Sequence, residues 1–315
     1  MSAEPLNVCV LGGTGFVGTA LVNRLAQEGH WVRVPTRNRT HGEPLRVLPT
    51  VELVEANVHD RGTLDRLVEG MDAVINLIGI LNEHGRVTFQ SAHVALAEKL
   101  IAALKAARVR RLVQMSALGA AAQAPSRYLR SKAGAEAHIR AAAAHLDYTI
   151  FRPSVIFGPG DSLTRRFAGL LRLSAGFLPL ARTQARFTPV YVGDVADAFV
   201  LALRERKTFG QTYPLGGPEV MTLEQIVRLT AQVAGLPCRI LRLPDALGRV
   251  QAAVLGVLPG KPLTLDNFRS LTVDSICSED GLARLGLTAH RMMQILPGYL
   301  SPPALSGTFS HPRPI

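Results

Sequence analysis

Three glycines follow a short apolar run close to the start of the chain. Residues 8–18 read V-C-V-L-G-G-T-G-F-V-G, so a β-branched strand pattern leads directly into Gly12, Gly15 and Gly18. Glycine is needed here for a tight turn, for close approach of the backbone to a pyrophosphate, and for packing of a helix on a sheet. The free N–H groups of that helix then face the phosphates. The pattern predicts a dinucleotide site with contacts from Gly12, Thr14, Gly15, Phe16, Val17 and Gly18.

The segments around this loop complete a βαβ unit. Residues 16–28 have an amphipathic helical pattern, Gly29 is a stop signal, and residues 31–36 have the pattern of a second strand. A glycine pattern in isolation is weak, but one that stands between a strand and a helix is much more specific.

The rest of the first half alternates between strands and helices. Predicted strands cover residues 51–55, 73–79, 111–116 and 148–152, and predicted helices cover residues 63–68, 88–107 and 126–145. Continuous apolar strands separated by helices are typical of a parallel sheet that is covered on both faces. With 315 residues and 47% hydrophobic content, the chain can bury a large core. The predicted class is α/β, a doubly wound parallel sheet of the NAD(P)-binding Rossmann type.

The alternation stops at Pro159 and Gly160, which suggests a second, smaller unit. A helix at 192–205 and a strand at 212–215 are expected to return to the main sheet. Thr222 with Gln225 forms a capping box for a helix to residue 234, followed by a strand at 239–243 and an apolar helix at 245–257. We therefore predict a Rossmann domain over 1–215, with 161–186 inserted over a substrate cleft, a smaller α/β substrate or partner domain over 216–300, and an irregular tail over 301–315.

Targeting and redox signals are few. No basic n-region or apolar h-region precedes the first strand, and the apolar stretches 173–181 and 252–260 are shorter than the roughly 18 residues of a membrane span. The three cysteines are widely separated, so we expect free thiols in a reducing compartment and no metal site. The expected location is cytoplasmic, with a peripheral position at the inner face of the membrane as the alternative.

The net charge of +11 comes almost entirely from arginine. Genome composition alone can produce this, but residues 162–193 hold five arginines and no acidic residue: Arg165, Arg166, Arg172, Arg182 and Arg186. Guanidinium groups bind phosphate and carboxylate in a bidentate manner, so this segment favours an anionic, amphipathic substrate or an anionic membrane surface. A solvated basic helix is the simpler alternative. Nucleic acid is a poor explanation because aromatic residues make up only 5% of the chain.

Several motifs together resemble one enzyme superfamily. Besides the glycine loop they are Y-L-R-S-K at 128–132, R-P-S-V-I-F-G-P-G-D at 152–161, V-Y-V-G-D-V-A at 190–196 and L-G-G-P-E at 215–219. Over residues 7–235 the chain resembles an extended or atypical short-chain dehydrogenase/reductase. Within that group it is most similar to the nucleotide-binding accessory subunit of respiratory complex I and its bacterial relatives. The resemblance implies a nicotinamide cofactor and a possible connection with quinones.

Tyr128 and Lys132 are the predicted catalytic pair. Their i, i+4 spacing places both side chains on one helix face, and a neighbouring ammonium favours the phenolate form of a tyrosine. Such a pair can exchange a proton with a carbinol while hydride moves to or from nicotinamide. By resemblance, Lys132 also holds the nicotinamide ribose. The alternative is a surface tyrosine and lysine that meet by chance.

Two positions put turnover in question. Ser116 stands at the end of the fifth strand and is the candidate hydroxyl for polarising a carbonyl, but the position where the resemblance implies a catalytic serine is Leu118. His93 stands where related enzymes often have asparagine, and it is either part of a proton relay or a packed helix residue.

Cofactor preference is encoded after the second strand. An NAD site would place an acidic residue there, but the chain reads T-R-N-R at 36–39 and has no acid between Glu28 and Glu43. Arg37 therefore favours the 2′-phosphate of NADP(H), unless this arginine or Arg39 stacks on adenine or faces solvent. Further predicted cofactor contacts are Asn57, Asp60, Ile78, Gly79, Lys132 and Pro153, while Arg152 is either a ligand residue or a buried structural arginine.

Three functions remain compatible with the sequence. The first is an NADP(H)-dependent oxidoreductase acting on an apolar or anionic carbonyl or alcohol. The second is a non-catalytic nucleotide-binding accessory or assembly protein of respiratory complex I, in which the nucleotide stabilises the fold. A sugar-nucleotide epimerase or dehydratase is a weaker third possibility, because Leu118 disfavours it.

Overall fold

The fold centres on a seven-stranded parallel sheet, seen in a computed structural model that describes residues 4–258, 261 and 263–301. The strand order is β11-β6-β5-β4-β1-β2-β3, and every neighbouring pair is parallel. The strands are β1 (Asn7–Leu11), β2 (Trp31–Thr36), β3 (Val51–Glu55), β4 (Ala73–Asn76), β5 (Arg111–Met115), β6 (Asp147–Pro153) and β11 (Gln211–Leu215). The strand order reverses between β1 and β4, which is where ligands bind in open α/β sheets.

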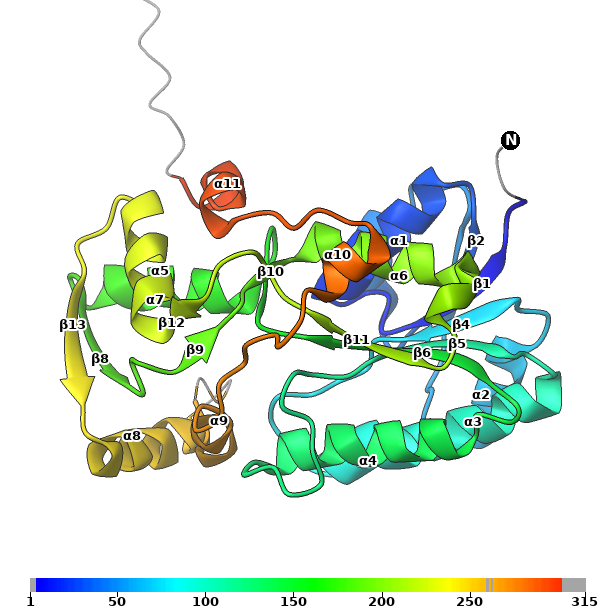
Figure 1. Cartoon of the computed structure of the whole chain (residues 1–315), viewed down its shortest axis with the longest axis horizontal. Helices are drawn as coiled ribbons and strands as arrows, with labels where there is room; N and C mark the ends of the chain where they lie inside the picture. The colour runs from blue at the N-terminus through cyan, green and yellow to red at the C-terminus, as the bar shows by residue number, and fades with distance from the viewer. Residues whose placement is uncertain (1–3, 259–260, 262, 302–315) are drawn as a thin grey trace, which may run out of the picture.

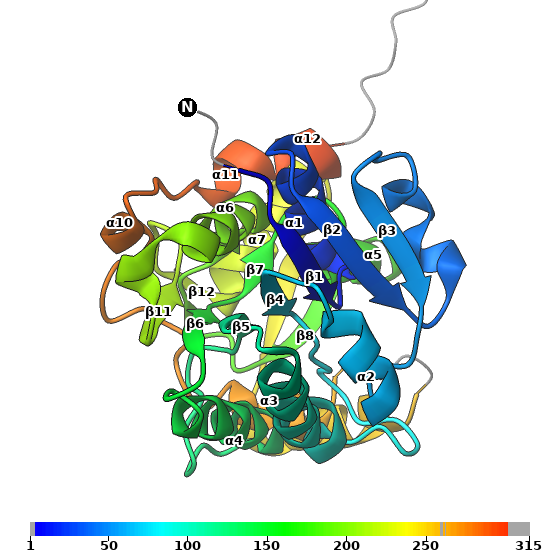
Figure 2. The same cartoon turned by 90° about the vertical axis from the view of Figure 1, so that its right-hand side faces the viewer.

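Helices cover both faces of this sheet (Figures 1 and 2). One layer holds α1 (Phe16–Gln27) and α6 (Val192–Arg204), and the other holds α2 (Arg61–Val68), α3 (Leu96–Ala107) and α4 (Arg127–Ala141). Strand β1 contributes to both cores, because Val8 and Val10 pack on the α1 side while Cys9 and Leu11 pack on the α2 side. This period-2 alternation is what a strand buried on both faces requires.

A smaller unit lies beside the carboxyl ends of the strands, at the left of Figure 1. It contains α5 (Ser162–Leu173), the parallel pair β8 (Phe177–Ala181) and β13 (Arg239–Leu243), α7 (Leu223–Val233), α8 (Asp245–Val257) and α9 (Leu265–Ser270). Two short strand pairs lie between it and the sheet: β7 (Ile156–Phe157) pairs with β10 (Val190–Tyr191), and β9 (Arg186–Phe187) pairs with β12 (Met221–Thr222). Toward the end of the described residues, α10 (Gly281–Leu285), α11 (Met292–Ile295) and α12 (Pro297–Leu300) lie on the side of the sheet that α1 and α6 cover (Figures 1 and 2).

The predicted fold class is confirmed. The strand expected at 212–215 does rejoin the main sheet as β11, and Thr222 forms the expected capping box with Gln225. The helix expected at 88–107 begins with a π-helical segment, Gln90–Ala95, before α3. The basic helix that was the simpler alternative for the arginine-rich segment is present as α5, whereas strand β8 was not predicted. The irregular tail expected from 301 lies outside the described residues apart from Ser301. In the described ranges, no helix combines the length and apolar content that crossing a bilayer requires.

Candidate active site

The glycine loop has the geometry that close approach demands. Gly12 has a φ of +83°, and a Cβ on Gly18 would lie 2.2 Å from the carbonyl oxygen of Gly12. No side chain caps the start of α1, where Gly15 is the N-cap residue. The first N–H groups of α1 are therefore available to a phosphate, and this loop fits the pyrophosphate of a dinucleotide.

Basic residues follow β2, as the sequence suggested. Asn38 accepts a hydrogen bond from the Thr40 N–H at 2.9 Å and so starts a short 3₁₀ helix, while Arg39 pairs with Glu55 at 3.4 Å. Arg37 is exposed and forms no ion pair within the described residues. Its guanidinium is thus the one in this group that an adenosine 2′-phosphate could engage without breaking an existing pair.

Asn57 and Asp60 already have local structural roles. The Asn57 Oδ1 accepts a hydrogen bond from the His59 N–H at 3.1 Å, and Asp60 caps α2 through the Thr63 N–H at 2.7 Å. The hydrogen bonds from Thr63 lower the pKa of Asp60. Cofactor contacts from these two residues stay a prediction.

The end of β4 is shaped by a buried amide pair. The Asn76 Nδ2 donates to Gln114 Oε1 at 2.9 Å, and Asn76 Oδ1 accepts from the Ile78 N–H at 3.2 Å. Ile78 also lies against the glycine loop, since a Cβ on Gly12 would meet the Ile78 nitrogen at 3.3 Å. Asn76 thereby fixes the backbone beside the predicted pyrophosphate position.

Lys132 brings three of the predicted site residues together. Its Nζ donates to the carbonyl oxygen of Met115 at 3.3 Å and would lie 3.0 Å from a Cβ on Gly79. The next residue, Ser116, is 3% exposed, and its buried Oγ has no hydrogen-bond partner among the described residues. The unpaired Ser116 hydroxyl follows directly after the carbonyl group that binds the buried Lys132 ammonium. Two such buried polar groups fit the ribose and carboxamide groups of a nicotinamide cofactor.

Burial shifts the pKa values of the predicted catalytic pair, Tyr128 and Lys132. It raises the pKa of Tyr128 to about 12, and it lowers the pKa of Lys132 to about 8 even though the charge of Glu136 opposes this shift. The expected lowering of the tyrosine pKa by the neighbouring ammonium is therefore absent in this structure, because desolvation dominates. Tyr128 is a neutral phenol at pH 7, which is the form that can donate a proton.

His93 is held as a neutral histidine by its partners. Ser131 donates its hydroxyl to the carbonyl oxygen of Tyr128, so it accepts a hydrogen bond from His93 Nδ1 at 2.7 Å, and His93 Nε2 accepts from the Ile80 N–H at 3.1 Å. Burial and the charge of Lys132 lower the pKa of His93 to about 3. Both ring nitrogens are occupied, which favours the packed-residue interpretation over a proton relay.

Arg152 forms a bidentate ion pair with Glu136, at 2.8 Å from Nε to Oε1 and 2.5 Å from Nη2 to Oε2. Glu136 is 3% exposed and stands one turn after Lys132 on α4. Arg152 is therefore the structural arginine that the sequence left as one of two alternatives. Pro153 follows it at the buried end of β6, bonded in register with Leu215 of β11.

Sequence reasoning missed Asp266. Its carboxylate accepts hydrogen bonds from the N–H groups of Arg127 and Tyr128, at 2.8 and 3.0 Å, and so closes the N-terminal end of α4 from α9. Glu83, after β4, also binds Arg127, at 3.0 Å. No local signal could reveal the Asp266 contact, because it joins positions 139 and 138 residues apart.

The arginines of the 162–193 segment divide into two groups. Arg165, Arg166 and Arg172 are exposed along α5, whereas Arg182 and Arg186 pair with acidic residues from later in the chain. Arg182 meets Asp245 at 2.5 Å, and Arg186 meets Asp274 at 2.7 Å. The segment is thus only partly available to an external anion.

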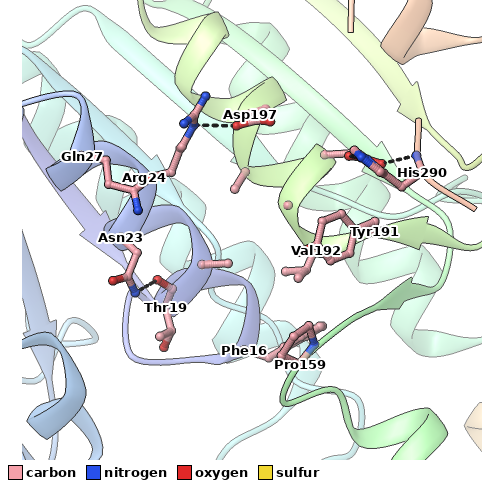
Figure 3. Close-up of a pocket in the computed structure, with 14 residues that line it drawn as sticks. Phe16, Thr19, Asn23, Arg24, Gln27, Pro159, Tyr191, Val192, Asp197 and His290 are labelled. Atoms are coloured by element: carbon pink, nitrogen blue, oxygen red, sulfur yellow. Dashed lines mark hydrogen bonds and ion pairs between the residues drawn. The ribbon is translucent and has the colours of Figure 1, made fainter. Parts of the chain in front are cut away.

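A separate groove of about 460 Å³ lies between α1 and α6 (Figure 3). Phe16 and Pro159 lie at one end, and His290, whose Nδ1 is 2.6 Å from Asp194 Oδ1, lies at the other. Tyr128, Lys132 and Ser116 are not among its lining residues. In the described part of the chain, no three His, Cys, Asp or Glu side chains gather as a metal site.

Comparison with known proteins agrees with this geometry. The profile of the NAD dependent epimerase/dehydratase family matches residues 8–216, and the chain belongs to that family. It is 33% identical over 309 residues to the NADH dehydrogenase [ubiquinone] 1 alpha subcomplex subunit 9 of Arabidopsis thaliana, which covers 92% of this chain and 76% of that protein.

One further relative and one solved structure extend the comparison. The chain is 32% identical over 247 residues to a protein named ceramide reductase from Caulobacter vibrioides, covering 76% of this chain and 74% of that protein. The fold is also similar to that of the NADPH-dependent quinone oxidoreductase QOR2 from Escherichia coli, with a TM-score of 0.72, 16% identity and coverage of 92% and 99% of the two chains. The predicted membership of the extended short-chain dehydrogenases near the complex I subunit is confirmed.

Replacing Gly18 tests the glycine loop. A Cβ there would overlap backbone atoms of Gly12 and Gly13, so Gly18→Ala should lower the free energy of unfolding by about 1–3 kcal/mol. Urea denaturation measures this change. The matched control is Gly62→Ala, where the nearest atom is an ordinary 3.8 Å away. Equal stability of the two variants would contradict the packing argument.

Replacing Lys132 should stabilise the protein. At pH 7 the lysine is charged in both states and its burial opposes folding, so Lys132→Met should raise the free energy of unfolding by about 1–2 kcal/mol. Because the native pKa of about 8 lies below the model-peptide value of 10.5, the unfolded chain binds more protons between these values. As pH rises from about 8 to 10.5, the cost of burying the Lys132 ammonium in the parent protein therefore decreases. The difference in the free energy of unfolding between Lys132→Met and the parent decreases with it.

Urea denaturation at a series of pH values measures the effect of Lys132→Met. The exposed Lys105→Met serves as the control and should leave stability unchanged within about 0.5 kcal/mol. A variant at Lys132 that is less stable than the parent at pH 7 would show that the hydrogen bond to Met115 outweighs the desolvation of the ammonium.

Proposed function

We propose that this protein is an NADP(H)-dependent reductase of a carbonyl group on an apolar or anionic molecule. The observation that carries the proposal is the buried Lys132 Nζ beside Gly79 and the carbonyl oxygen of Met115, one helical turn from Tyr128. A buried lysine opposes folding, so its presence suggests that it has a function. Groups with perturbed pKa values of this kind are concentrated at active sites.

The residues present fit a nicotinamide dinucleotide. The glycine loop and the start of α1 would hold the pyrophosphate, and Lys132 with Ser116 would bind the nicotinamide half. When bound, the reduced cofactor supplies hydride to the substrate carbon. The site would then need a proton for the substrate oxygen.

Tyr128 is suited to supply that proton. Its phenol is neutral at pH 7, since burial raises its pKa to about 12. Its ring packs edge-on against Phe89 and His93, with centroids 6.0 and 5.7 Å apart, which restrains the phenol without involving its oxygen. A positioned neutral phenol is a general acid, and this protonation state favours the direction of carbonyl reduction.

Arg37 supports the choice of NADP(H) over NAD(H). It is exposed, forms no ion pair within the described ranges and follows the strand at which an NAD site would carry an acid. Arg39 is already engaged with Glu55, so Arg37 is the better candidate for the 2′-phosphate.

The nature of the substrate is suggested by the relatives and by the arginines. One relative is named ceramide reductase, and another, from Streptomyces griseus, is named (4-alkanoyl-5-oxo-2,5-dihydrofuran-3-yl)methyl phosphate reductase, with 30% identity over 240 residues. Both names are those of reductases, and the second names a phosphate ester. An apolar or anionic substrate is consistent with the exposed arginines of α5.

A second function is favoured by one residue. Leu118 stands where a catalytic hydroxyl is expected, and its backbone N–H is bonded to the Pro153 carbonyl oxygen at 3.0 Å, so no side-chain oxygen is offered there. Together with the similarity to the Arabidopsis subunit, this supports an accessory or assembly role in a respiratory complex, in which the nucleotide is structural.

The variant Tyr128→Phe separates the two functions. It removes the proton donor and keeps the ring packing, so turnover of a carbonyl substrate should fall at least about a hundredfold while the affinity for NADPH stays within about twofold. Steady-state kinetics and a fluorescence titration of NADPH measure the two quantities. Unchanged function in Tyr128→Phe, with co-purification of complex I subunits, would support the accessory role and exclude the reductase.

The variant Arg37→Gln tests the cofactor preference. The affinity for NADPH should fall about tenfold, because a charge-assisted phosphate contact is lost, and the affinity for NADH should not change. Arg46→Gln removes an exposed charge nearby and is the matched control. Mass spectrometry of the nucleotide that co-purifies with the native protein provides an independent check, and finding NAD(H) there would contradict the proposed preference.

A further inference from the structure

A cavity of about 320 Å³ lies in the smaller unit, between β8, α8 and α9. It is separate from the glycine loop and from Tyr128, and its lining consists of Arg182, Arg249, Leu265, Phe268, Arg269 and Thr272. Half of these residues are arginines, and they come from three elements or loops that are up to 87 positions apart. The fold therefore gathers three guanidinium groups that the sequence does not place together.

Few of the hydrogen-bond donors in this cavity have partners. The exposed side chains of Arg249 and Arg269 form no hydrogen bond or ion pair with the described residues. Arg182 uses its Nη2 to bind Asp245 at 2.5 Å, but its Nε is buried and lacks an acceptor within the described part of the chain. A buried guanidinium N–H without an acceptor is uncommon in native structures and calls for a missing partner.

One of the three guanidinium groups in the cavity has an acidic partner within the described residues. Asp245 pairs with Arg182, while Asp266 accepts the N–H groups of α4 and Asp274 pairs with Arg186. The guanidinium groups of Arg249 and Arg269 are therefore left without an ion pair in the described part of the chain. A compact anion with several acceptor oxygens would satisfy both the excess charge and the free donors.

The cavity is formed by close packing and not by loosely placed side chains. The Arg182 guanidinium lies over the Phe268 ring at 5.3 Å from its centroid. Gly248 lets α8 approach so closely that a Cβ there would lie 2.4 Å from Ala181 and 2.8 Å from Phe268. That contact fixes the backbone of α8 at the residue before Arg249, on the wall of the cavity.

We propose that this cavity binds a phosphate group through the guanidinium groups of Arg182, Arg249 and Arg269. Phosphate matches the bidentate geometry of arginine and can accept several hydrogen bonds at once. The proposal concerns a site outside the predicted cofactor site and does not depend on whether Tyr128 turns over substrate.

The surface of α8 suggests where such a phosphate comes from. Leu247, Val250, Val254 and Val257 are between 54% and 83% exposed and follow helical spacing, so they form an apolar stripe on the helix that carries Arg249. A basic site beside an apolar stripe fits an amphiphile whose phosphate enters the cavity while its chains lie along α8. A free phosphate ester is the second source of the same chemistry.

The test uses the full chain and a charge-matched pair of variants. The site variant is Arg249→Gln with Arg269→Gln, and the control is Lys105→Gln with Arg206→Gln, two exposed cations outside the cavity. Calorimetric titration with glycerol 3-phosphate measures the soluble source. Co-sedimentation with vesicles of phosphatidylcholine and phosphatidylglycerol, against phosphatidylcholine alone, measures the lipid source.

Loss of at least about tenfold in affinity in the site variant, with the control unchanged, would support a phosphate site. If this loss appears with glycerol 3-phosphate, the source is a soluble ester. If it appears only with anionic vesicles, and Val250→Ser with Val254→Ser weakens it further, the source is a lipid headgroup. Binding to neither probe, or an equal loss of affinity in both charge variants, would overturn the proposal. Circular dichroism of each variant checks that it is folded.

Discussion

Burial of the central strands on both faces determines where chemistry can occur in this protein. Alternate residues of β1 enter two separate cores, and no polar side chain can be placed along these strands without an internal partner. Among the buried polar groups of β4 and β5, Arg111 at the amino end of β5 donates to the carbonyl oxygens of Asp147 and Ala202, whereas Asn76, Gln114 and Ser116 lie toward the carboxyl ends. The predicted site lies at this edge of the sheet because polar side chains in the interior are bonded to internal partners and are not available to a ligand.

One face of helix α4 supplies the predicted site residues that lie at this edge of the sheet. Tyr128, Lys132, Glu136 and Arg140 follow at four-residue intervals, so they form one row on the helix. Glu136 is occupied by the guanidinium of Arg152, at 2.5 and 2.8 Å, and also meets Arg140 at 3.4 Å. Its charge is therefore shared, and it only partly offsets the desolvation that lowers the pKa of Lys132. The protonation of the site depends on a pair one turn away.

The sequence patterns correctly predicted those features of the fold that depend on residues close together in the chain. The glycine loop, its flanking strand and helix, and the capping box at Thr222 are short-range features, and the structure contains each of them. The predictions did not include β8 or the contact from Asp266, because both depend on partners far along the chain. Strand β8 is completed by β13, some sixty residues later, and Asp266 reaches α4 across 138 residues. The pKa of Tyr128 was misjudged for the same reason, since burial by distant segments outweighs a neighbouring charge.

Helix α9 connects the two parts of the molecule. On one side its Asp266 accepts the first N–H groups of α4, the helix that carries Tyr128, and on the other side Phe268 and Arg269 line the basic cavity. The helix has only six residues, so it cannot be held in place by its own hydrogen bonds. Its position comes from tertiary contacts, which also include the hydrogen bonds of Thr264 to Asn82 and of Asn267 to the Leu81 carbonyl oxygen. An anion in the cavity would add contacts to one side of α9 and thereby stabilise the cap on the other, which links the occupancy of the smaller unit to the order of the helix that bears the predicted acid.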